Sequence, residues 1–221
     1  MFNSISLNAL PWLRFILNNA TKPSFMVYNY AMTSLRLFIA IDFSSGTIRK
    51  ISTLELELQE RLSACPIRWV SPINLHLTLQ FLGETNQGKI PVIIQALDST
   101  AAVFDPFNVQ LFSLGCFPSL KKPEVIWLGL NQEKALFNLA ETLSAHLKPL
   151  GFSTNGKFLP HLTLGRVNKN AGESEQKLIG EVLKAHQDVE IGQDEVEQII
   201  LYKSTLTPRG PIYTPLHCSK L

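Results

Sequence analysis

The sequence predicts an α+β fold of two pseudo-symmetric lobes, each a mainly antiparallel sheet with helices outside, around a central cleft. Two observations lead to this fold. The tetrapeptide His-Leu-Thr-Leu occurs twice, at residues 76–79 and 161–164. Each copy follows a strand pattern and an amphipathic helix pattern, so both halves of the chain have the same order of elements. We expect pseudo-twofold packing to bring the polar faces of the two copies onto one cleft.

The first half is predicted from its apolar periodicity. Residues 35–41 form a short run of strand-forming residues, and Ser44 follows as a candidate helix cap. Apolar residues then recur at helical spacing until Pro66 ends the helix. The expected elements are a strand over 35–41, a helix from about 48 to 65, a strand over 67–70, the first motif strand up to Gly83, and a helix over about 87–101.

The second half repeats this order and adds a final hairpin. Lys121 and Lys122 are expected in a basic loop between its first two strands. Pro160 suits the start of the second motif strand because it cannot donate a ladder hydrogen bond. The expected elements are strands over 107–117 and 124–130, a helix over about 136–147, the second motif strand, a helix over 173–186, and an antiparallel hairpin of strands 198–206 and 211–218.

Composition fits one medium domain or two small lobes. The chain has 221 residues, of which 45% are hydrophobic and 17% charged, so it can bury a sizeable core. The net charge of +2 gives no global nucleic-acid signature, and any anion site must be local. The cysteines are Cys65, Cys116 and Cys218, without a Cys-x-x-Cys pair. We expect buried, reduced thiols and a cytoplasmic location.

The N-terminal segment differs from the rest of the chain. It contains no acidic residue before Asp42. Its apolar stretch is interrupted by Pro11 and Arg14, so it is too short to span a bilayer and lacks the pattern of a secretory signal. We expect residues 1–31 to be an extension outside the fold, with a transit peptide as the alternative, and residues 32–221 to form a single bilobal domain.

The repeated motif predicts acid–base chemistry. Side chains in a strand alternate between faces, so His76 and Thr78 are expected on one face, with Leu77, Leu79 and Phe81 on the other. His161 and Thr163 are likewise expected to share a face. Imidazoles titrate near neutral pH, and hydroxyl groups donate hydrogen bonds to anionic oxygens. This set suits attack of water or of a hydroxyl group on a phosphodiester.

Alternatives for these histidines are weaker. A metal site would need further ligands, and the sequence has no His-Glu-x-x-His motif, no Cys/His cluster and no acid within either tetrapeptide. No metal or cofactor is therefore expected. His146, His186 and His217 have no patterned neighbours, and we expect them to be structural.

The chain resembles the 2H phosphoesterase superfamily, named for two His-x-Thr/Ser-x motifs, and within it the RNA 2′,3′-cyclic phosphodiesterase family, historically called 2′-5′ RNA ligases. The resemblance covers about residues 35–216 and is absent from residues 1–31. The segments that carry it are RLFIAID (36–42), RWVSPINLHLTLQFLGE (68–84), FPSLKKPEVIWLGL (117–130), PHLTLGRV (160–167) and LYKSTLTPRGPIYTPL (201–216).

The resemblance implies a bilobal α+β fold and a reaction. Family members hydrolyse terminal 2′,3′-cyclic phosphates of RNA to 2′-phosphomonoesters without metal. Carried over to this chain, it makes His76 the proton donor to the leaving 3′-oxygen and His161 the base that activates water. Thr78 and Thr163 would hold the non-bridging oxygens of the phosphate. The near-identity of the two motifs leaves the choice of acid and base open from the sequence alone.

Three further residues are candidates for substrate binding. Arg166 matches a phosphate-contacting arginine of some family members, five residues after the second histidine. By strict alternation it lies opposite His161, unless the strand ends, twists or bulges near Gly165. Phe81 and Tyr213 are candidates for stacking on a base, although core packing is the stronger expectation for Phe81.

The expected partners are RNA ends or small nucleotides with a 2′,3′-cyclic phosphate. We expect no membrane association and a monomer. Two other functions stay open. The same residues would serve a 2′-5′ RNA ligase or a hydrolase of another cyclic phosphate or 2′-5′ linkage. A non-catalytic RNA- or nucleotide-binding module is the third hypothesis, although binding alone does not need two opposed titrating groups.

Overall fold

One continuous sheet organises the protein. The computed structural model describes residues 33–131, 134–153, 156–208 and 210–221, and the expected extension lies outside them. The strand order is β7-β4-β5-β6-β3-β1-β8-β9, with β2 paired to β6. The strands are β1 (Ser34–Ile41), β2 (Ile67–Trp69), β3 (Leu77–Asn86), β4 (Phe107–Ser119), β5 (Lys122–Leu130), β6 (His161–Val167), β7 (Glu190–Val196), β8 (Gln198–Thr207) and β9 (Gly210–Lys220). All of their pairings are antiparallel.

The helices begin and end where local chemistry favours it. Ser44 caps the first one, because its side chain accepts a hydrogen bond from the backbone nitrogen of Thr47 at 3.2 Å. Pro91 lies in the first turn of the second, where its missing N–H costs nothing. The α-helices are α2 (Ser45–Arg61), α3 (Ile90–Ala101), α4 (Lys134–Leu147) and α5 (Glu173–Ala185), and short 3₁₀ turns cover Pro72–Asn74, Gln87–Lys89 and Lys148–Leu150.

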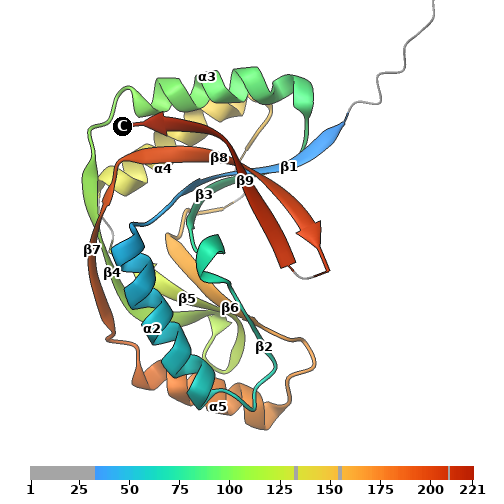
Figure 1. The fold of residues 1–221 in the computed structure, drawn as a ribbon, viewed down its shortest axis with the longest axis vertical. Helices are drawn as coiled ribbons and strands as arrows, with labels where there is room; N and C mark the ends of the chain where they lie inside the picture. Colours follow the sequence, from blue (N-terminus) through green and yellow to red (C-terminus); the bar gives the residue numbers. More distant parts are fainter. Residues whose placement is uncertain (1–32, 132–133, 154–155, 209) are drawn as a thin grey trace, which may run out of the picture. The chain divides into compact units, whose positions relative to one another are not determined.

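The sheet consists of two halves that meet at a single residue pair, Leu77 of β3 with Leu162 of β6. One lobe contains β3, β1, β8 and β9 with α3 and α4, and the other contains β6, β5, β4 and β7 with α2 and α5 (Figure 1). The lobes are interwoven. Helix α2 follows β1 but packs on β7 of the other lobe, whereas α4 follows β5 but packs against α3.

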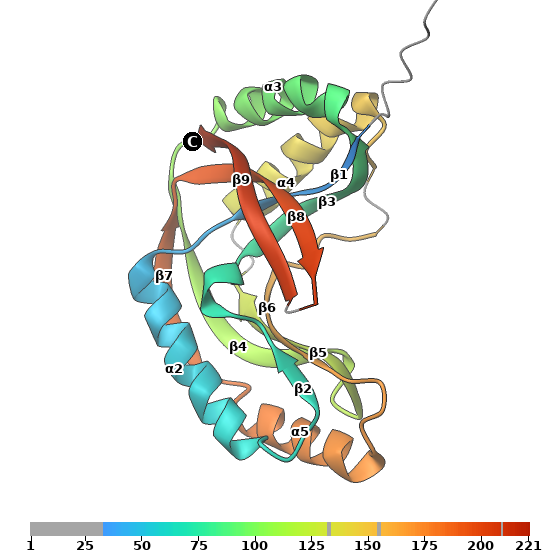
Figure 2. The ribbon, with the colours of Figure 1, turned by 45° about the vertical axis from the view of Figure 1, so that its right-hand side comes forward.

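The main core lies between the sheet and its helices. A single cluster of buried apolar side chains runs through both lobes and includes residues from all four helices. The opposite side of the sheet has a smaller cluster of Phe38, Ala40, Ile200 and Tyr202, with Tyr213 packed against it. The β8–β9 hairpin that carries Tyr213 reaches toward the other lobe (Figure 2). One face of the sheet is therefore covered by helices, and the other carries an aromatic cluster.

The predicted α+β fold with two pseudo-symmetric lobes is confirmed, and the predicted elements occur in the expected order. One strand was missed. β7 has the sequence EIGQDEV and pairs with β4, and its buried Asp194 accepts a hydrogen bond from the backbone nitrogen of Ser44 at 2.7 Å. This strand owes its conformation to tertiary pairing, because its local sequence is too acidic to suggest a buried strand.

Two smaller expectations are wrong. Lys122 belongs to β5 and not to a loop, since it pairs with Ser119 across the β4–β5 turn. All three cysteines are free, but only Cys65 and Cys116 are buried, whereas Cys218 is exposed on β9.

Within the described residues, every helix is too short or too polar to cross a bilayer.

Candidate active site

The contact between the two lobes is also the contact between the two motifs. Leu77 pairs with Leu162, and antiparallel register sets His76 beside Thr163 and Thr78 beside His161. Both leucines are buried in the main core. Because neighbours along a strand alternate, the histidines and threonines point to the opposite side of the sheet. We call this side, defined by these four polar residues, the motif face.

A bulge in β3 changes the position of Phe81. Leu79 is an extra residue opposite β1, and such an insertion exchanges the faces of the residues that follow. Phe81 therefore pairs with Phe38 and lies on the motif face, where it is 68% exposed. The expectations that Phe81 points away from His76 and packs in the core are wrong, because strict alternation does not survive the bulge.

A bulge at the equivalent place in β6 changes the position of Arg166. Leu164 is the extra residue there. Thr163 pairs with Trp127, and Arg166 pairs with Val125, two residues further along β5. Positions two apart in a strand share a face, so Arg166 lies on the motif face with Thr163. Arg166 could share a face with His161 only if the strand were irregular near Gly165. The bulge at Leu164, one residue before Gly165, is that irregularity.

Both histidines are anchored in the same way. Nδ1 of His76 donates to the carbonyl oxygen of Asn74 at 2.7 Å, and Nδ1 of His161 donates to that of Leu159 at 2.8 Å. A carbonyl oxygen can only accept, so Nδ1 carries the hydrogen in each neutral ring. Nε2 is then the atom left for proton transfer. In the first motif, Nε2 of His76 also lies 3.0 Å from Oγ1 of Thr78.

His76 lies in an aromatic environment. Its ring centroid is 5.0 Å from that of Phe38 and 5.2 Å from that of Tyr213. Burial lowers the pKa of His76, while its hydrogen bond to the Asn74 carbonyl and the charge of Asp42 raise this pKa. The charge of His161 also acts to lower the pKa of His76, so the two imidazoles lie within electrostatic reach of each other.

The β8–β9 hairpin completes this side of the site. Nδ2 of Asn74 donates to the carbonyl oxygen of Pro211 at 3.1 Å, which ties the His76 loop to the hairpin. The hydroxyl group of Tyr202 donates to Asp42 at 2.6 Å and fixes that carboxylate. Burial raises the pKa of Tyr213, while the nearby charges of Arg166 and Arg36 lower it.

His161 is supported by the β4–β5 pair. The ring of Phe117 meets His161 edge-on, with centroids 5.0 Å apart, and also packs against Trp127 at 5.3 Å. Trp127 lies across Gly115, where an added Cβ would come within 2.4 Å of the indole ring. Only glycine allows this close approach of strand and ring.

The structure thus brings the predicted site residues onto one side of the sheet. Sequence reasoning missed Phe38, Asp42 and Phe117, although alternation along 36–42 would have aligned Phe38 with Asp42. In the described part of the chain, no three His, Cys, Asp or Glu side chains converge as a metal site requires. His146 binds Thr100, His186 binds Glu57 and His217 binds Asp98. The predicted residues on the motif face are His76, Thr78, Phe81, His161, Thr163 and Arg166, with Tyr213 against His76.

Comparison with known proteins agrees with this arrangement. The family model described as "LigT like Phosphoesterase" matches the chain twice, over residues 41–127 and 128–213. The chain therefore belongs to the LigT-like phosphoesterase family, part of the 2H phosphoesterases. Each match contains one His-Leu-Thr-Leu motif, which supports the internal repeat inferred from the sequence.

Relatives with assigned activities match over nearly their whole length. The RNA 2′,3′-cyclic phosphodiesterase of Methanothermobacter thermautotrophicus is 31% identical over 187 residues, covering 85% of this chain and 99% of the relative. That of Thermotoga maritima is 37% identical over 183 residues, covering 83% and 94%.

Solved structures show the same fold. A crystal structure of a Thermus thermophilus protein, 28% identical, has a TM-score of 0.69 and covers 85% of this chain and 98% of its own. E. coli LigT complexed with 3′-AMP, 27% identical, has a TM-score of 0.64 and covers 85% and 98%.

Proposed function

We propose that this protein hydrolyses terminal 2′,3′-cyclic phosphates of RNA to 2′-phosphomonoesters by two-histidine acid–base catalysis that needs no metal. The observation that carries the proposal is the pairing of Leu77 with Leu162, which sets two His/Thr pairs on one face. The names of the relatives supply the reaction class. The backbone anchors of both histidines support it further, because they leave two Nε2 atoms for proton transfer.

In the proposed reaction, His161 is the base and His76 is the acid. Nε2 of His161 takes a proton from water as the water oxygen bonds to phosphorus. The bond from phosphorus to the 3′-oxygen breaks, and Nε2 of His76 gives its proton to that oxygen. The products are a 2′-phosphate and a 3′-hydroxyl group. Each proton transfer of this kind contributes about 10²–10⁴-fold in rate.

The surroundings suit these roles. Charge builds on the non-bridging oxygens in the transition state, and donors aimed at them lower its energy. Thr78 and Thr163 are the donors in this proposal, and Arg166 contacts a phosphate of the substrate. The pKa of His76 is lowered on balance, mainly by burial, and the carboxylate of Asp42 opposes this lowering by favouring the protonated form that an acid requires.

The aromatic residues supply a platform for the terminal base. Phe81 is exposed on the motif face, and Tyr213 lies edge-on to His76. Stacking on such rings tolerates any base, which suits a protein that acts on RNA ends. E. coli LigT has been crystallised with 3′-AMP, with ATP and with phosphate, ligands that share a phosphate group.

Product analysis of an oligonucleotide with a 2′,3′-cyclic phosphate tests the proposal. We expect a 2′-phosphate end, formed equally well in the presence of a metal chelator. A joined 2′-5′ product would support ligation by the same residues, and unchanged substrate that still binds would support a binding module. Loss of activity on chelation would contradict the metal-independent mechanism. A cytoplasmic location and a monomeric state stay predictions.

A further inference from the structure

Two arginines face each other beside the site. Arg68 of β2 pairs directly with Arg166 of β6, and both side chains are exposed. Like charges placed directly opposite destabilise an antiparallel pair. Among the ion pairs of the described residues, none involves either arginine. An anion held between the two guanidinium groups would replace this repulsion with attraction.

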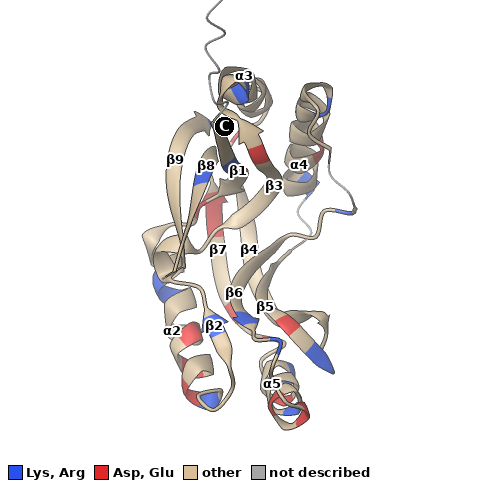
Figure 3. Cartoon of the chain, turned by 90° about the vertical axis from the view of Figure 1, so that its right-hand side faces the viewer, with Lys and Arg blue, Asp and Glu red and all other residues tan. Residues whose placement is uncertain are grey.

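The backbone points Arg68 toward the motif face. Ile67 and Trp69, its neighbours in β2, pack against the main core. An added Cβ at Gly165 of β6 would lie 3.0 Å from Ile67 Cγ2 and 3.1 Å from Trp69 Cε3, so β2 rests closely on β6. Alternation then puts Arg68 on the side away from the core, level with Arg166. Figure 3 shows basic residues on both β2 and β6 in this part of the sheet.

The arginine pair is displaced from the reacting groups by a definite amount. Thr163 and Arg166 pair with Trp127 and Val125, which lie two residues apart in β5. At about 3.3 Å per residue, the arginines lie roughly 7 Å further along the sheet than Thr163. That separation is on the order of one nucleotide, so a substrate whose cyclic phosphate lies at the threonines would bring its next phosphate to the arginines.

We propose that Arg68 and Arg166 together bind the phosphate on the 5′ side of the terminal nucleotide. This subsite rests on the proposed function and deepens it, because it makes a phosphorylated or chain-linked end a better ligand than a bare nucleoside cyclic phosphate. Guanidinium groups bind phosphate through paired, charge-assisted hydrogen bonds. The effect of Arg166 on the pKa of Tyr213 agrees with a guanidinium group that extends over the motif face.

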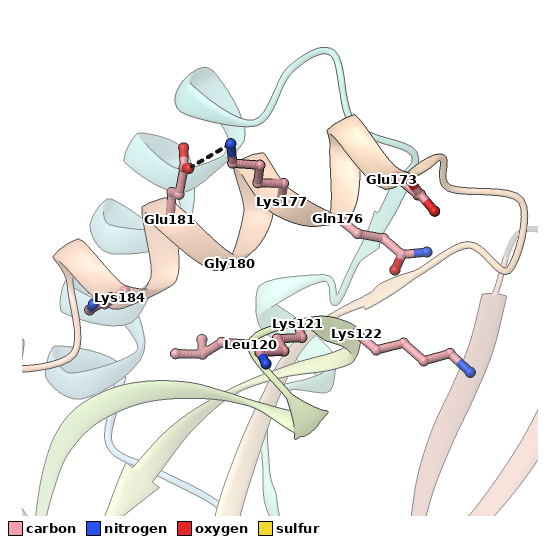
Figure 4. A pocket seen from close by; sticks show the side chains of 9 residues that line it. All are labelled: Leu120, Lys121, Lys122, Glu173, Gln176, Lys177, Gly180, Glu181 and Lys184. Atoms are coloured by element: carbon pink, nitrogen blue, oxygen red, sulfur yellow. Dashed lines mark ion pairs between the residues drawn. The ribbon is translucent and has the colours of Figure 1, made fainter.

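A second basic surface fits this role less well. A groove of about 580 Å³ lies between α5 and the β4–β5 turn, and Figure 4 shows its side chains. Two of its lysines are already paired with carboxylates, Lys177 with Glu181 at 3.9 Å and Lys122 with Glu124 at 3.7 Å. The groove includes α5, which packs on the helix-covered side of the sheet. Lys184, which lines it, therefore offers a control for loss of one positive charge away from the motif face.

The test compares two pairs of ligands. Calorimetry measures the binding of a nucleoside 2′-phosphate and of the corresponding nucleoside 2′,5′-bisphosphate, and kinetics compare a nucleoside 2′,3′-cyclic phosphate with its 5′-phosphorylated form. We expect Arg68→Ala to weaken binding and raise KM roughly tenfold for the 5′-phosphorylated ligands alone, with kcat unchanged. Arg68→Lys should recover part of the loss, because a lysine keeps the charge without the planar fork. Lys184→Ala should leave the binding and the KM of both ligands in each pair unchanged.

The outcomes separate this inference from the function on which it rests. Equal losses for both ligands of a pair, or no loss at all, would overturn the subsite, as would a selective loss in Lys184→Ala. If the wild-type protein hydrolyses neither cyclic phosphate, the proposed reaction fails. The binding measurements then still decide whether the arginine pair recognises a 5′-phosphate, because they do not depend on turnover.

Discussion

The two His-Leu-Thr-Leu motifs share a backbone and differ in their surroundings. Both histidines donate from Nδ1 to the carbonyl two residues earlier, and both strands have a bulge at the second leucine. The residue five positions after each histidine then returns to the motif face. It is Phe81 in the first motif and Arg166 in the second. The repeated backbone thus supplies two matched His/Thr pairs, while one side chain per motif makes one side apolar and the other basic.

The two histidines also have different neighbours. His76 is surrounded by Phe38 and Tyr213 and lies within reach of the Asp42 carboxylate. His161 contacts Phe117 and is supported from β4 and β5. An acid and a base need different environments, and a perfectly symmetric site would not distinguish them. The difference between the motifs is therefore where the assignment of roles can be tested.

Replacing either histidine should have the largest effect. We expect His76→Ala and His161→Ala each to lower kcat for a cyclic-phosphate dinucleotide by about 10²–10⁴-fold, because each removes one proton-transfer step. Circular dichroism should show an unchanged fold. His146→Ala, which alters a histidine bound to Thr100, is the matched control. Near-wild-type turnover in one of the two variants would show that the motifs are not equivalent partners.

Replacing the threonines should have the second-largest effect. Thr78→Val and Thr163→Val keep the side-chain shape and remove the hydroxyl donor, so we expect kcat to fall by up to about 10²–10³-fold. Serine at either position restores the hydroxyl group and should recover most of the activity. A loss confined to one motif would mean that only one threonine holds the phosphate.

Phe81 should affect binding with little effect on folding. Phe81→Ala removes a ring that is 68% exposed, so we expect stability to stay nearly constant. Loss of base stacking costs about 1–3 kcal/mol and should appear as a higher KM. Its strand partner Phe38 is 3% exposed, and Phe38→Ala should instead destabilise the protein by about 3–5 kcal/mol. Thermal unfolding and KM together distinguish the two phenylalanines. A clear loss of stability in Phe81→Ala would contradict the exposed position of Phe81 on the motif face.

The smallest expected effect is a shift in the pH profile. The Asp42 carboxylate raises the pKa of His76, so Asp42→Asn should lower that pKa. If His76 is the acid, it must be protonated, and the basic limb of kcat/KM moves to lower pH. If His76 is the base, the acidic limb moves instead. We expect the basic limb to move, and a shift of the acidic limb would exchange the proposed roles. Asp105→Asn, in the connection between α3 and β4, is the control.

The sequence predicted the repeat, the order of elements and the paired motifs, because these depend on local periodicity. It did not predict the bulges at Leu79 and Leu164, because register is set by partner strands far away in the chain. Strict alternation therefore predicts the wrong face for Phe81. The sequence did not predict the exchange of α2 and α4 between lobes for the same reason, since their apolar stripes do not specify which half of the sheet they pack beside.

The central claim is that the two histidines share one site, and a titration of His76 followed by NMR tests it most directly. The charge of His161 lowers the pKa of His76. Removing that charge in His161→Ala should therefore raise the pKa of His76. The control is His186→Ala, at the C-terminal end of α5 beside Glu57, which should leave the pKa of His76 unchanged. A His76 pKa that is the same in the wild-type protein and in His161→Ala would contradict a shared site.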